Sequence, residues 1–129
     1  RPSATAAMTA HVVYTAWDAA RCATLSPTVV ADIIRGRIGF DGLLMSDDLA
    51  MQALSGALEE TALGALAAGC DLVLHCNGEL AELAALARVL PPLTPEGQAR
   101  LDRLRPPPAA APADLAALMA ERDALMAAA

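Results

Sequence analysis

Short apolar segments alternate with segments of helical spacing through most of the chain. Residues 6–14, 43–45 and 70–76 are predicted strands, because they are rich in Val and Leu and have little polar interruption. The middle segment is apolar without alternation, as expected of a parallel strand that is covered on both faces. We therefore expect these three strands to share one buried sheet.

Capping signals place helices between the strands. Ser26 and Pro27 form a preferred helix opening, and Gly36 or Gly39 closes that helix. A second helix is predicted from about Leu58 to Ala68 and stops at Gly69, and a third covers residues 79–90. The alternation of strands and helices with short crossovers predicts an α/β fold with a parallel sheet and helices outside it.

The last part of the chain has a different character. Thr94 and Pro95 begin a predicted helix, residues 106–108 are prolines that predict an extended linker, and residues 112–129 predict a final helix. We therefore divide the chain into a sheet region, residues 1–90, and a helical tail with a Pro-rich linker, residues 91–129.

The best candidates for chemistry follow the middle predicted strand. Ser46, Asp47 and Asp48 come where that strand should end, and the carboxyl ends of parallel strands are where ligands bind in α/β folds. An alternative is that an aspartate there caps the next helix, a position that Asp favours. Side-chain alternation does not choose between Asp47 and Asp48, because both faces of the strand are apolar.

Composition narrows the class of protein. The chain has 129 residues, is 56% apolar and carries a formal charge of −6, with no basic stripe, so we expect neither a nucleic-acid nor a membrane partner. Its three cysteines lack the spacing of a disulfide framework and fit reduced thiols in a cytoplasmic protein. His75 and Cys76 would point to opposite faces of a strand, so no metal site is expected, and no Gly-rich loop predicts a cofactor.

The size of the sheet points to a part of a larger fold. Three parallel strands do not close a (β/α)8 barrel, which needs roughly 200 residues or more. The chain also begins with Arg1 in place of an initiator Met. We therefore expect this chain to be the C-terminal part of a larger protein.

Several motifs occur together in one order along residues 8–78. They are Met8-Thr9-Ala10-His11-Val12-Val13-Tyr14, Gly39-Phe40-Asp41-Gly42, Ser46-Asp47-Asp48-Leu49-Ala50-Met51, Ala68-Gly69-Cys70-Asp71 and Cys76-Asn77. In these motifs the chain resembles the C-terminal part of the bacterial β-N-acetylhexosaminidases of glycoside hydrolase family 3, which are cytoplasmic enzymes of cell-wall recycling. The resemblance implies a (β/α)8 TIM barrel, of which the three strands would be the sixth, seventh and eighth.

The resemblance also implies roles for individual residues. Asp47 matches the family's nucleophile, which attacks the anomeric carbon of a terminal N-acetylglucosamine in a peptidoglycan fragment such as a muropeptide. The result is a covalent glycosyl-enzyme that water resolves with retention of configuration. Asp48 would instead bind backbone donors, and His11 is a candidate for lining the sugar pocket.

The other half of the expected machinery lies outside this chain. The family's general acid/base is a His on a loop with a Lys-His-Phe-Pro-Gly-His-Gly type motif, and no such motif occurs here. We therefore expect the chain to need the missing N-terminal barrel portion for activity. Two alternatives stay open: a different barrel enzyme that uses Asp47 or Asp48 as acid/base or metal ligand, and a non-catalytic remnant or association module.

Overall fold

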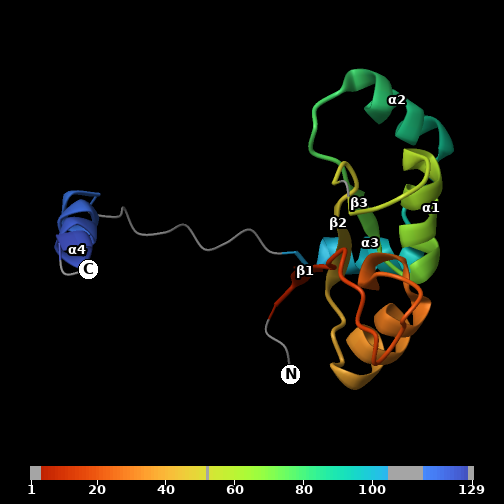
Figure 1. Cartoon of the computed structure of the whole chain (residues 1–129), viewed down its shortest axis with the longest axis horizontal. Helices are drawn as coiled ribbons and strands as arrows, with labels where there is room; N and C mark the ends of the chain where they lie inside the picture. The colour runs from red at the N-terminus through yellow and green to blue at the C-terminus, as the bar shows by residue number, and fades with distance from the viewer. Residues whose placement is uncertain (1–3, 52, 105–114, 128–129) are drawn as a thin grey trace.

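Three parallel strands form the centre of the molecule (Figure 1). The computed structural model describes residues 4–51, 53–104 and 115–127. The strands are β1 (Ala6–Met8), β2 (Leu43–Asp48) and β3 (Leu72–Leu74), and β2 lies in the middle. Ala6 pairs with Leu43, and Met45 pairs with Leu72. The predicted α/β class and parallel sheet are confirmed.

Helices connect and cover the strands. They are η1 (Ala23–Leu25), η2 (Thr28–Arg37), α1 (Leu58–Ala68), α2 (Leu80–Val89), α3 (Pro95–Asp102) and α4 (Leu115–Ala127). The bounds predicted for α1 are confirmed, and Gly69 closes it with a φ of 112°, a conformation that favours glycine. Ser26 Oγ accepts a hydrogen bond from the Val29 amide at 3.1 Å, so the serine caps η2 as predicted. The helix itself has the wider π winding, with the Ile38 amide bonded to the Ile33 carbonyl.

The core lies between β2 and the two helices η2 and α1. It contains the following buried residues: Val30, Phe40, Leu44, Ala65, Ala68 and Cys70. Helix α1 contributes only small side chains, Ala65 and Ala68, to this cluster. A Cβ added at Gly69 would lie 2.9 Å from Val30 Cγ1, so the close approach of the end of α1 to η2 depends on glycine.

Two predicted strands are shorter than expected. The prediction of a strand over residues 6–14 was wrong beyond Met8, because the chain leaves the sheet there, and the Val12 carbonyl bonds the Ala23 amide of η1. The strand predicted over residues 70–76 covers only Leu72–Leu74, since the Cys70 amide is used to close α1 through the Ala65 carbonyl. Tertiary contacts thus override the strand propensity of both segments.

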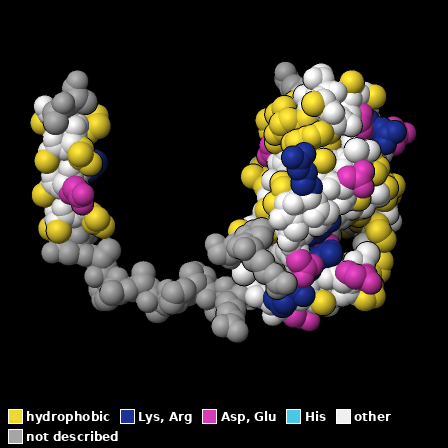
Figure 2. All heavy atoms as spheres, turned by 90° about the horizontal axis from the view of Figure 1, so that it is seen from below, with side chains coloured by type: hydrophobic (Ala, Val, Ile, Leu, Met, Phe, Trp, Pro, Cys, Tyr) yellow, Lys and Arg dark blue, Asp and Glu magenta, His cyan; other side chains and the backbone are white. Residues whose placement is uncertain are grey.

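Ion pairs join the tail to the amino end of the sheet. Arg35 Nη2 lies 2.9 Å and Arg100 Nη1 2.7 Å from the carboxylate of Asp71, which is only 4% exposed. Arg103 of the same tail region bonds Asp41. Charges of both signs are also mixed on the face that Figure 2 shows.

The predictions for the tail have different outcomes. The helix predicted at Thr94 is confirmed. The linker at 106–108 lies outside the described residues, and the boundary at residue 90 stays a prediction.

Candidate functional site

The carboxyl end of β2 carries an irregularity in strand pairing. Met45 pairs with Leu72 and Asp48 pairs with Leu74, so three steps along β2 match two along β3. The extra residue falls within the Ser46–Asp47 segment, and Ser46 Oγ accepts a hydrogen bond from the Leu74 amide at 2.9 Å in place of a backbone carbonyl. Such bulges redirect side chains and are frequent beside active sites. Ser46 is fully buried and serves the sheet, so it is not a reactive hydroxyl.

Asp47 lies in this irregular segment with little to hold its carboxylate. Its Oδ1 accepts a hydrogen bond from the Asp48 amide at 2.9 Å. Among the described residues, its Oδ2 has no hydrogen-bond partner and the carboxylate has no ion pair. The side chain is partly exposed. One oxygen of Asp47 is therefore oriented by the protein, and the other is available to a ligand.

Asp48 has a different set of contacts. Its Oδ1 accepts hydrogen bonds from the Ala50 amide and the Cys76 amide, both at 3.0 Å. The carboxylate therefore ties the turn after β2 to the segment after β3, which is the backbone-binding role predicted for it. The structure thus distinguishes two adjacent acids that the sequence pattern leaves equivalent.

His11 uses both ring nitrogens in contacts with the protein. Nδ1 lies 2.8 Å from Thr24 Oγ1, and Nε2 lies 2.9 Å from the Asp48 carbonyl oxygen. His11 is thus beside the strand end that carries Asp47, and its contact with the sugar stays a prediction. Sequence reasoning missed the hydrogen bond to Asp48, because the two residues are far apart in the chain.

His75 and the cysteines do not gather into a site. The His75 side chain is only 3% exposed and pairs with Glu82 Oε2 at 2.8 Å, just past the end of β3. Burial raises the pKa of the Cys70 thiol to about 11, which keeps it protonated and unreactive at neutral pH. No group of three or more His, Cys, Asp or Glu side chains suited to a metal ion occurs in the described part of the chain.

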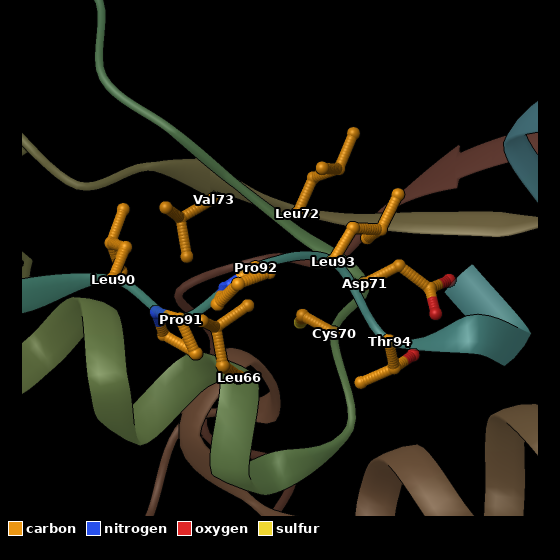
Figure 3. A pocket seen from close by; sticks show the side chains of 10 residues that line it. All are labelled: Leu66, Cys70, Asp71, Leu72, Val73, Leu90, Pro91, Pro92, Leu93 and Thr94. Atoms are coloured by element: carbon orange, nitrogen blue, oxygen red, sulfur yellow. The ribbon is translucent and has the colours of Figure 1, made fainter. Parts of the chain in front are cut away.

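A separate hollow of about 220 Å³ lies against β3 (Figure 3). It is lined mostly by apolar side chains of β3 and of the segment after α2, including Val73, Leu90 and Leu93. Its acid, Asp71, is already bound by two arginines, and its hydroxyl, Thr94 Oγ1, caps α3. The hollow therefore lacks free polar groups at the places where a sugar would need them.

Comparisons with known proteins identify the family of this chain. Residues 2–104 match the family model described as the "Glycosyl hydrolase family 3 N terminal domain". The chain belongs to glycosyl hydrolase family 3. Among its relatives, a β-hexosaminidase of Chromobacterium violaceum is 46% identical over 101 residues, which cover 77% of this chain and 28% of the relative. One of Aromatoleum aromaticum is 42% identical over 106 residues, 81% of this chain and 30% of the relative.

A solved structure extends this similarity to three dimensions. The family 3 β-N-acetylglucosaminidase of Paenibacillus sp. superposes with a TM-score of 0.59 at 38% identity, over 66% of this chain and 17% of that protein. This family 3 chain therefore spans less than a third of the length of the relatives it matches. In the described residues, no helix is long and apolar enough to span a membrane.

Proposed function

We propose that the protein carrying this chain is a retaining β-N-acetylhexosaminidase and that Asp47 is its nucleophile. The observation that carries the proposal is the state of the Asp47 carboxylate at the carboxyl end of β2: one oxygen is oriented by the Asp48 amide, and the other has no partner among the described residues. The names of the relatives, β-hexosaminidase and β-N-acetylglucosaminidase, support this class of substrate.

In the proposed reaction, Asp47 Oδ2 attacks the anomeric carbon of a terminal N-acetylglucosamine. The glycosidic bond breaks, and the leaving oxygen takes a proton from a general acid outside this chain. Water then attacks the same carbon and gives a proton to the same group outside this chain, now acting as a base; the glycosyl–Asp bond breaks, and the carboxylate is regenerated with the sugar's configuration retained. A carboxylate suits this role because it stabilises the positive charge that develops on the sugar ring.

We further propose that the three parallel strands form the last part of a (β/α)8 barrel and that the substrate is a peptidoglycan fragment in the cytoplasm. The length of the relatives supports the first point, because they contain more than twice as much chain as this one. The preceding part of the barrel would supply the acid/base and most sugar contacts. This chain would then be the part that carries the nucleophile.

The test is hydrolysis of an aryl N-acetyl-β-glucosaminide by the protein expressed from its whole coding sequence. We expect release of the aryl alcohol with retained configuration at the sugar, no effect of a chelator, and loss of activity in Asp47→Asn. Loss of activity on chelation would favour an acid/base or metal role in another type of barrel enzyme. Equal activity of Asp47→Asn and the parent would exclude the nucleophile assignment.

A chimera separates the chemistry of this segment from the remainder of its own protein. Residues 2–104 would replace the matching segment of the Chromobacterium violaceum β-hexosaminidase, to which the chain is 46% identical. An active chimera that depends on Asp47 supports a functional nucleophile segment. A folded but inactive chimera would favour a non-catalytic remnant.

A further inference from the structure

We propose that His11 is a positioning residue that holds the Asp47 nucleophile in place through the backbone of Asp48. This inference rests on the proposed function for its catalytic consequence, but the hydrogen bonds that suggest it do not. They place the imidazole against the residue whose amide orients Asp47.

The contact of Nε2 defines the tautomer of His11. A carbonyl oxygen only accepts, so Nε2 must carry the proton in its 2.9 Å contact with the Asp48 carbonyl. In the neutral ring, Nδ1 then accepts from the Thr24 hydroxyl at 2.8 Å, and the Thr24 oxygen accepts from Thr9 Oγ1 at 2.9 Å. Both threonines are buried, so this chain of hydrogen bonds holds the ring in one orientation.

The imidazole replaces strand pairing where β1 has ended. One residue past β1, the Thr9 amide donates to the Met45 carbonyl of β2 at 2.9 Å. The chain then leaves the sheet, and His11 reaches back to Asp48. On the opposite side, the Leu49 amide bonds the Leu74 carbonyl at 2.8 Å. The peptide group between Asp48 and Leu49 is therefore held from both sides, by His11 and by β3.

The backbone of Asp48 connects the His11 contact to the Asp47 carboxylate. The Asp48 carbonyl also accepts from the Met51 amide at 3.1 Å, while the Asp48 amide donates to Asp47 Oδ1. Because the irregular pairing removes regular ladder bonds from Ser46 and Asp47, the position of Asp48 depends on these extra contacts. Loss of the His11 bond should let Asp48 shift and misdirect the carboxylate, and displacements of about 1 Å can cost about 100-fold in rate.

Two variants of His11 distinguish positioning from other roles. His11→Gln keeps an N–H donor at the distance of Nε2 and can still reach the Asp48 carbonyl. His11→Asn places its amide near the position of Nδ1 and cannot. On an aryl N-acetyl-β-glucosaminide we expect kcat to fall about 100-fold in His11→Asn with KM changed by less than about threefold, and His11→Gln to recover most of the loss.

The matched control is His75→Asn, which alters the other histidine of this chain, bonded to Glu82. Its kcat should remain within about threefold of the parent. A raised KM with unchanged kcat in both His11 variants would overturn the proposal in favour of direct sugar contact. An unchanged kcat per folded molecule in His11→Asn would also overturn it and leave a purely structural histidine.

A readout independent of activity separates this inference from the proposed function. Deuterium exchange of the peptide over residues 45–51 should accelerate in His11→Asn and return toward the parent in His11→Gln. Unchanged exchange in His11→Asn would overturn the positioning role. If exchange responds as expected but Asp47→Asn retains full activity, the coupling of His11 to the strand end stands while the nucleophile assignment fails.

Discussion

The aspartates at the two ends of the sheet differ in burial and in the contacts of their carboxylates. At the amino end, Asp71 is almost fully buried, bound by Arg35 and Arg100, and its Oδ2 also accepts from the Leu44 amide at 2.8 Å. At the carboxyl end, Asp47 is partly exposed, accepts one amide, and has no ion pair among the described residues. A carboxylate that is bound through both oxygens maintains the fold, whereas one with an oxygen free of protein contacts can react.

The largest expected effect is on turnover, at the carboxyl end. Asp47→Ala should lower kcat by about 10³-fold or more, because the attacking oxygen is removed, while the free energy of unfolding changes little. Initial rates on an aryl N-acetyl-β-glucosaminide and urea unfolding of the same samples provide the two measurements. A large loss of stability with normal turnover would mean that the two ends do not differ in role.

At the amino end of the sheet, we expect a substitution to lower stability and to leave turnover unchanged. Asp71→Ala should cost about 3 kcal/mol of unfolding free energy, because Arg35 and Arg100 lose their shared partner in a largely buried position. Turnover per folded molecule should be retained. Urea unfolding compared with Asp32→Ala, an exposed acid on η2, checks the prediction. Equal midpoints for the two variants would contradict it.

Asp48→Ala is expected to have a smaller effect on stability. Its carboxylate accepts from two amides, Ala50 and Cys76, so its loss should cost about 1 kcal/mol. Because the backbone amide that orients Asp47 remains, turnover should fall far less than in Asp47→Ala. Residual activities that are equal in Asp47→Ala and Asp48→Ala would overturn the distinction between the adjacent acids.

The smallest expected effect concerns the reactivity of two thiols, one of them in the core. Cys70 is buried, and burial raises the pKa of its thiol to about 11, whereas Cys76 is exposed. At pH 8, iodoacetamide should label Cys76 and leave Cys70 unmodified, as peptide mapping would show. The stability gained from keeping Cys70 protonated is fully present below its ordinary pKa of 9.0 and is lost as the pH rises through about 11. Rapid labelling of native Cys70 at pH 8 would contradict this.

Sequence patterns that act over a few residues were enough to predict much of the fold. Glycine at the end of α1 and Ser26 and Thr94 at helix starts act through backbone groups a few residues away, so their patterns predicted those ends correctly. The strand lengths were less predictable. Val12 and Val13 have strand propensity, yet the chain leaves the sheet at that point to reach η1.

The candidate site was predictable only in part, for a related reason. The sequence placed the polar run at the carboxyl end of the middle strand, as the structure does, but the different contacts of Asp47 and Asp48 depend on the shifted pairing with β3. That shift is a property of two segments together, and neither segment shows it by itself. The same holds for His11, whose partner Asp48 is 37 positions away.

The hydrogen bond to the Ser46 hydroxyl limits the side chains that position 46 can accept. Because the hydroxyl accepts the hydrogen bond of the part-buried Leu74 amide, an alanine there would leave that amide without this acceptor. Ser46 is itself fully buried, so a larger apolar side chain would also need space that the packed sheet does not offer. Libraries that randomise this strand should therefore return small oxygen-bearing side chains at position 46.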